Sequence, residues 1–161
     1  MAEELLKERA LELWRAGYVH QMRGDLPRAI ELYSESIKLH PTAEAYTFRG
    51  WAYRFLDRID EAIAECRKAI TVDPEFGNPY NDIGAYLIDQ GKLDEAIEWL
   101  NKAKRAARYE PRQFPFMNLG RLYEAKGMIN QAIAEFAAAL EIAPGDPTCE
   151  HSIARLRAML N

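Results

Sequence analysis

Two small residues recur in step along this chain, and their spacing constrains its fold more than any other feature. Both series advance by 33, 34 and 36 residues. They are Gly17, Gly50, Gly84 and Gly120, and Ala29, Ala62, Ala96 and Ala132. Internal periods of roughly 20 to 50 residues are typical of stacked supersecondary units, each of which buries its apolar face only against its neighbours. We therefore expect a solenoid of four similar units.

Each unit is expected to contain two helices joined by a short turn. Apolar residues recur at i, i+3, i+4 and i+7, most cleanly through Tyr80, Ile83, Gly84 and Leu87, and no stretch alternates with the two-residue period of a strand. Proline lacks an N–H group and disfavours helix at the residue before it. The second helix of each unit is therefore expected to end near a proline. These prolines are Pro41, Pro74, Pro111 and Pro144.

The residues resemble the tetratricopeptide repeat family, whose pattern has an aromatic residue, Leu-Gly and Tyr in the first helix and Ala, Phe or Tyr, Ala and Pro in the second. The last unit matches nearly in full, with Phe116, Leu119, Gly120, Tyr123, Gly127, Ala132, Phe136, Ala139 and Pro144. The resemblance covers about residues 10 to 146. It implies an all-α fold, a right-handed superhelix (an alpha-alpha solenoid) of four helix-turn-helix units.

We expect a single domain over 1–161, with repeats at about 10–42, 43–76, 77–112 and 113–146. Residues 147–160 predict one further amphipathic helix, with Asp146 as its N-cap and Pro147 at its first position. Such a helix would cap the apolar end of the stack. The third repeat is longer than the others, since Pro111 lies 15 residues after Ala96 whereas the other units have 12. We expect its second helix to be about one turn longer.

Composition argues against several classes of function. The net charge is -4, whereas a dedicated nucleic-acid binder normally has a basic surface. The first 25 residues carry charges throughout, so we expect no signal peptide, no direct membrane insertion and a cytoplasmic protein. Cys66 and Cys149 are the two cysteines, too few for a disulfide framework.

The sequence shows no catalytic pattern. The three histidines lie in different units, without metal-ligand spacing between them or to a cysteine. The repeat explains the glycines, so no phosphate loop or nucleophile elbow remains. We therefore expect no enzyme, no cofactor and no metal site. The expected role is a scaffold for protein–protein interaction, with a protein or peptide as partner.

The resemblance also implies where a partner would bind, because the first helix of each tetratricopeptide pair faces the concave surface. The N-terminal half of this groove is aromatic and the C-terminal half is mostly polar. Carried over to this sequence, the partner-binding residues are Trp14, Tyr18, Phe48, Trp51, Arg54, Phe55, Asn78, Asn81, Asn118, Arg121 and Arg155. Some family members hold a chaperone's C-terminal carboxylate with lysine, asparagine and arginine side chains in the groove. That clamp is absent here, where the corresponding places carry Trp14, Tyr18, Phe48, Asn78 and Asp82.

The aromatic residues are the clearest functional signal. Trp14 and Tyr18 lie four residues apart, as do Trp51 and Phe55, so each pair shares one helix face. Exposed apolar patches usually mark a partner surface, and tryptophan and tyrosine often dominate binding energy. One alternative is that the superhelix curves enough to bury several of these rings. Another is that the patch meets its own copy in a homodimer.

Basic residues form two further candidate features. Arg121 and Arg155 occupy equivalent places 34 residues apart, and paired arginines can hold a carboxylate. The other interpretation is a pair of solvated arginines balanced by Glu124 and Glu150. The extra stretch of the third repeat is also basic. Either a solvated helix end or contact with an acidic partner would explain it. Its residues are Lys102, Lys104, Arg105 and Arg108, with Arg112 beyond.

Overall fold

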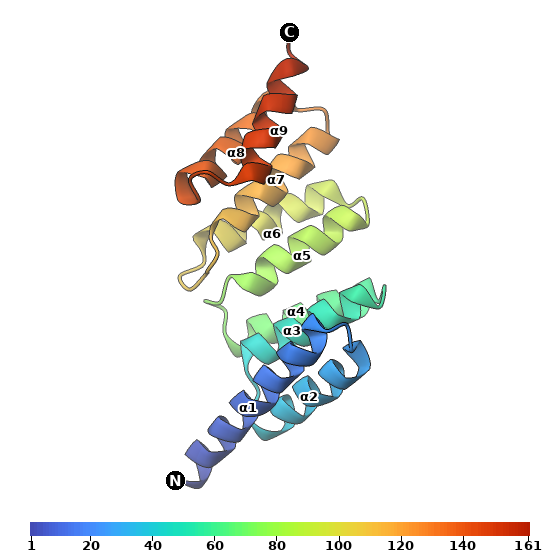
Figure 1. Ribbon diagram of the computed structural model, residues 1–161, viewed down its shortest axis with the longest axis vertical. Helices are drawn as coiled ribbons and strands as arrows, with labels where there is room; N and C mark the ends of the chain where they lie inside the picture. Colours follow the sequence, from blue (N-terminus) through green and yellow to red (C-terminus); the bar gives the residue numbers. More distant parts are fainter.

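The computed structural model describes residues 1–161, and its regular elements are nine α-helices. They are α1 (Ala2–Met22), α2 (Leu26–Leu39), α3 (Ala43–Phe55), α4 (Ile59–Val72), α5 (Asn78–Asp89), α6 (Leu93–Arg105), α7 (Gln113–Ala125), α8 (Ile129–Ile142) and α9 (Pro147–Ala158). Successive helices pair into four hairpins, which stack along one axis with the chain ends at opposite poles (Figure 1). The predicted all-α superhelix of helix-turn-helix units is confirmed.

The recurring glycines lie where paired helices approach closely. A Cβ atom on Gly84 of α5 would lie 2.5 Å from Cγ and Cδ2 of Leu100 in α6. On Gly17 of α1 it would lie 2.7 Å from the Tyr33 ring in α2. No side chain larger than hydrogen fits at such contacts without displacing its neighbour. The recurring alanines are fully buried on the opposite helices, at Ala29, Ala62, Ala96 and Ala132.

Helix α9 closes the C-terminal end of the stack (Figure 1). The Asp146 carboxylate accepts a hydrogen bond from the backbone N–H of Cys149 at 3.0 Å, so Asp146 is the N-cap and Pro147 opens the helix as expected. Ile153 and Leu156 pack against Phe136 of α8 in one buried cluster. The helix therefore covers apolar surface that a following repeat would otherwise bury.

The prediction of a longer second helix in the third repeat is wrong. Helix α6 has 13 residues and ends at Arg105, while α2, α4 and α8 have 14 each. The extra residues instead form an extended segment, 106–112, beside the α4–α5 connection. Arg108 donates its backbone N–H to the Glu75 carbonyl at 3.0 Å and accepts from the N–H of Gly77 at 2.9 Å.

Tertiary contacts explain why segment 106–112 leaves the helix. The Arg108 guanidinium donates to Glu44 of α3 at 2.8 Å and to Asp73 at 2.6 Å. The Tyr109 ring is buried against Gly77, where a Cβ atom would lie 2.3 Å from it. A continued helix would lose these contacts. The basic excess of the third repeat is thus partly engaged within the chain itself.

Candidate partner-binding groove

Five aromatic side chains from α1 and α3 form a continuous row, which we call the aromatic wall. They are Trp14, Tyr18, Phe48, Trp51 and Phe55. The ring centroids of Trp14 and Tyr18 are 6.3 Å apart on α1, and those of Trp51 and Phe55 are 5.3 Å apart on α3. Phe48 joins the two pairs through edge contacts, at 5.2 Å to Trp14 and 5.9 Å to Trp51. The sequence-predicted aromatic residues therefore lie together.

The aromatic wall has a packed inner edge and an open outer edge. Trp14 and Phe48 are partly buried and pack against a core cluster built around Tyr33. Trp51 is also partly buried, but Tyr18 remains 40% exposed and Phe55 57% exposed. An exposed patch and a set of buried rings therefore each describe part of the wall. Its rings support the fold from one side and present apolar surface to solvent on the other.

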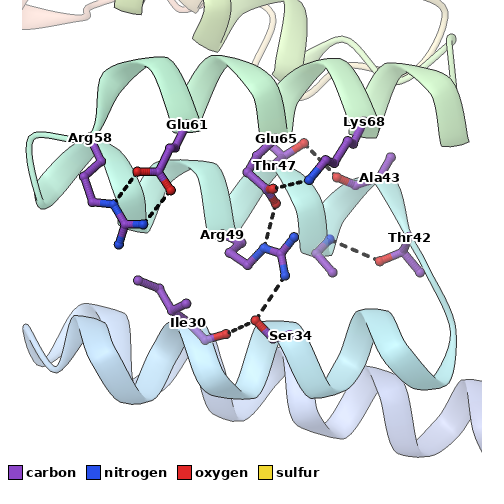
Figure 2. Close-up of polar contacts among 11 residues, drawn as sticks. Ile30, Ser34, Thr42, Ala43, Thr47, Arg49, Arg58, Glu61, Glu65 and Lys68 are labelled. Carbon is purple, nitrogen blue, oxygen red and sulfur yellow. Dashed lines mark hydrogen bonds and ion pairs between the residues drawn. The ribbon is translucent and has the colours of Figure 1, made fainter.

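A buried polar network positions α3, which carries three of these rings. Arg49 of α3 donates from Nε to the Glu65 carboxylate of α4 at 2.6 Å and from Nη1 to the Ser34 hydroxyl of α2 at 3.0 Å. Figure 2 shows these contacts, together with the Lys68 ammonium, which donates to Glu65 at 3.0 Å. Glu65 is only 4% exposed. The network links three successive helices and fixes the height of α3 in the stack.

Beside the aromatic wall the groove deepens into a pocket of about 280 Å³, which we call the central hollow. It lies between helices α1, α3, α5 and α7 and segment 106–112. Its lining residues are Tyr18, Thr47, Phe48, Trp51, Asn78, Asn81, Asp82, Tyr109, Pro111 and Phe114. Five of the predicted binding residues meet here, namely Tyr18, Phe48, Trp51, Asn78 and Asn81.

The polar groups of the central hollow are unevenly satisfied. Asn81 is buried, and its Oδ1 accepts from Nδ2 of Asn118 at 2.9 Å. Oδ1 of Asn78 is buried without a hydrogen-bond partner. Burial raises the pKa of Asp82 to about 7, while a side-chain hydrogen bond from Asn81 opposes this shift. The hollow therefore holds one carboxyl group and one amide oxygen with unused hydrogen-bonding capacity.

Sequence reasoning did not include Asp82, Tyr109 or Pro111 among the binding residues. Asp82 occupies a groove position, but its isolation from basic side chains depends on how the helices stack. Tyr109 and Pro111 were assigned to the end of a helix, whereas they belong to the extended segment that forms one side of the hollow. Gly77 was the available signal, because a glycine outside the repeat pattern accommodates the Tyr109 ring.

The remaining predicted residues belong to a second region, which we call the polar ladder. It consists of the predicted Arg54, Asn118, Arg121 and Arg155 together with their neighbours Asp89 and Glu124. The Arg54 guanidinium donates to Asp89 at 3.0 Å, and Arg121 donates to Oδ1 of Asn118 at 2.9 Å. Arg155 of α9 makes two contacts with the Glu124 carboxylate of α7, at 2.5 Å and 2.9 Å. Each arginine of the ladder thus has an acceptor within the chain.

The structure contains neither a metal-binding cluster nor a membrane-spanning helix. No cluster of three or more His, Cys, Asp or Glu side chains has the arrangement needed to coordinate a metal ion. None of the nine helices combines the length and the apolar character needed to cross a bilayer.

Comparison with known protein families identifies the repeat. Tetratricopeptide repeat profiles match residues 13–43, 43–76, 78–109 and 116–146. Small glutamine-rich tetratricopeptide repeat-containing protein 2 of Saccharomyces cerevisiae is 34% identical over 97 residues, which is 60% of this chain and 28% of the yeast protein. The chain thus spans less than a third of that relative's length.

Solved structures agree on the fold. Pseudomonas aeruginosa PilF matches with a TM-score of 0.86 at 22% identity, over 97% of this chain and 69% of PilF. YrrB, described as a tetratricopeptide repeat protein with an unusual peptide-binding site, matches with a TM-score of 0.67 at 23% identity, over 95% of this chain and 78% of YrrB. At these identities the likeness concerns the architecture alone.

Proposed function

Since the chain belongs to the tetratricopeptide repeat family, we propose that it is a non-catalytic scaffold whose concave groove binds a segment of a partner protein. The observation that carries this proposal is the aromatic wall, in which neighbouring rings contact one another while Tyr18 and Phe55 remain exposed to solvent. Exposed aromatic clusters of this kind are the usual anchors of protein interfaces.

Binding would combine apolar anchoring with polar alignment. An extended or helical segment places aromatic or aliphatic side chains against the outer edge of the wall. Polar groups on later helices then fix its direction. These are Asn78, Asn81, Asn118, Arg121 and Arg155. The buried Arg49–Glu65 pair holds α3 in place before a partner arrives, so little ordering entropy is lost on binding.

The fold comparison supports the same role. YrrB is described as a tetratricopeptide repeat protein with a peptide-binding site, although an unusual one. A shared superhelix provides a concave surface of similar construction. The residues that recognise a segment are nevertheless those of this chain, so the proposal depends on the aromatic wall rather than on the likeness.

Selection from a displayed random-peptide library tests the proposal. We expect the wild-type protein to enrich peptides with aromatic or aliphatic anchors and the Trp51→Ala/Phe55→Ala variant to lose at least about a hundredfold in affinity for them. The matched control is Val72→Ala/Ile142→Ala, which removes two exposed apolar side chains from the second helices α4 and α8. This control is expected to keep wild-type affinity.

Circular dichroism and thermal unfolding establish that both double variants are folded before affinities are compared. Enrichment of the same peptides with equal affinity by wild type and Trp51→Ala/Phe55→Ala would show that binding, if any, occurs away from the wall. Failure to enrich any peptide would equally oppose the proposal.

Self-association is the second candidate use of the aromatic wall, because one exposed apolar patch can meet its copy across a two-fold axis. Light scattering across a concentration range separates the two roles. A monomer at high concentration excludes the homodimer. A dimer that dissociates in the Trp51→Ala/Phe55→Ala variant, and not in the Val72→Ala/Ile142→Ala control, would favour it.

A further inference from the structure

The central hollow has the composition of a cation site. Its lining contains one carboxyl group, two amides and five aromatic rings, and it contains no lysine, arginine or histidine. We propose that the hollow binds a guanidinium group, supplied by an arginine side chain of the partner segment. This inference rests on the proposed function and names the chemistry that the groove selects.

Asp82 is the first line of support, because it differs from the other acidic groups around the groove. Glu44 pairs with Arg108, Asp89 pairs with Arg54 and Glu124 pairs with Arg155. Asp82 forms no ion pair, and none of the residues that line the hollow is basic. A carboxylate that is partly removed from water without a counterion is costly. An incoming cation would remove that cost.

Aromatic rings are the second line of support. Outside the hollow, several rings already have a cation of this chain over one face, with Arg58 lying 4.6 Å from the Tyr53 centroid and Arg108 lying 4.3 Å from the Phe76 centroid. No such cation lies over the rings that line the hollow. They are Tyr18, Phe48, Trp51, Tyr109 and Phe114. Aromatic faces attract cations most strongly where water is partly excluded, so a ring face that opens on the hollow can receive an external cation.

The arrangement favours guanidinium over ammonium. A guanidinium group is planar, is more weakly hydrated than an ammonium and carries five N–H donors. It can stack on Trp51 while it donates to Asp82, since both residues line the hollow. The volume of about 280 Å³ suits one long side chain and excludes a folded domain.

The protonation state of Asp82 links occupancy of the hollow to pH. Burial raises its pKa to about 7, so a bound cation, which stabilises the carboxylate, would bind more tightly as the pH rises from 6 to 8. The charge on Asp82 affects three titratable groups, namely Cys66 of α4, Tyr86 of α5 and Tyr109 of segment 106–112. Burial raises the pKa of each, and the charge on Asp82 raises it further, so all three stay neutral in this range.

Two small probes test the inference without a known partner. Nα-acetyl-arginine amide and its neutral counterpart, Nα-acetyl-citrulline amide, are titrated into the 15N-labelled protein at pH 8. We expect the arginine probe to bind about tenfold more tightly, as an added charge-assisted hydrogen bond predicts, and to shift the Trp51 indole and Asn78 amide resonances.

Asp82→Asn is expected to reduce the affinity for the arginine probe to that for the citrulline probe. The matched control is Asp94→Asn, which removes the same charge from the exposed start of α6 and should leave both affinities unchanged. Equal binding of the two probes by wild type, or full retention of arginine binding in Asp82→Asn, would overturn the inference. If Asp82→Asn fails to fold, the comparison of the two probes on the wild-type protein still tests the inference.

The two proposals can fail separately. Peptides that require Trp51 and Phe55 but bind equally with arginine or citrulline would keep the groove and remove the guanidinium site. Conversely, the arginine probe could bind the hollow although the protein enriches no peptide. That result would keep the guanidinium site and remove the proposed peptide-binding groove.

Discussion

The aromatic wall and the polar ladder lie along the same groove, yet they differ in how far the chain satisfies its own side chains. In the ladder, each guanidinium meets a carboxylate or amide from its own or another helix. In the wall, the rings meet one another, and their outer edges meet only solvent. Unsatisfied groups are where an external partner gains most, because nothing internal has to be displaced. The difference therefore assigns anchoring to the wall and alignment to the ladder.

The largest expected effect is loss of the buried pair that supports the wall. Glu65→Ala leaves the Arg49 guanidinium partly buried without its carboxylate, so we expect about 3 kcal/mol less free energy of unfolding, measured by urea denaturation. Glu61→Ala is the control, since it removes an exposed glutamate one turn earlier on α4, where it pairs with Arg58. Equal losses for the two variants would mean that the support of α3 is not specific to the buried pair.

The second-largest expected effect concerns the close contact between helices α5 and α6. Gly84→Ala places a Cβ atom 2.5 Å from Leu100, which is fully buried, and we expect a loss of about 2 kcal/mol in the free energy of unfolding. Gly91→Ala is the comparison, since no atom lies within 4 Å of its Cβ but its φ of +75° disfavours alanine. There we expect a loss of about 1 kcal/mol. A larger loss at Gly91 than at Gly84 would contradict the close-contact explanation.

The repeat made the helices and the wall predictable, because both depend on local spacing. Residues four apart share a helix face whatever the curvature of the stack, so Trp51 and Phe55 were bound to be neighbours. Segment 106–112 was not predictable in the same way. Three extra residues indicate an insertion, but its conformation depends on the distant contacts of Arg108 with Glu44 and Asp73.

The pairing of charged side chains also could not be predicted from the sequence. Whether Arg155 meets Glu124 or Glu150 depends on how α9 lies over α7, and the structure pairs it with Glu124. Likewise, the isolation of Asp82 follows from the absence of basic residues among the side chains that line the hollow. Sequence periodicity specifies which face of its helix a residue occupies. The stacking of the helices determines which residues lie opposite that face.

Stability should depend on pH through Asp82, which lines the central hollow. Its folded pKa of about 7 exceeds the usual 3.8, so the folded state binds more protons than the unfolded state between these values. The free energy of unfolding therefore falls as the pH rises from about 4 to 7. Asp82→Asn removes this dependence, so we expect it to be more stable than wild type at pH 8 and equal to it near pH 4. Parallel pH profiles of unfolding for the two proteins would contradict the assignment.

The smallest expected effect lies at the far end of the polar ladder. Arg155→Gln breaks an exposed pair with Glu124, and exposed pairs contribute little, so we expect no measurable change in melting temperature. For a peptide selected on the wild-type protein, we expect a loss of affinity of about threefold or less, against about thirtyfold for Phe55→Ala. Fluorescence anisotropy with one labelled peptide measures both variants under the same conditions. If Arg155→Gln weakens binding as much as Phe55→Ala does, the ladder is an anchor in its own right, and the division between the two halves of the groove has to be abandoned.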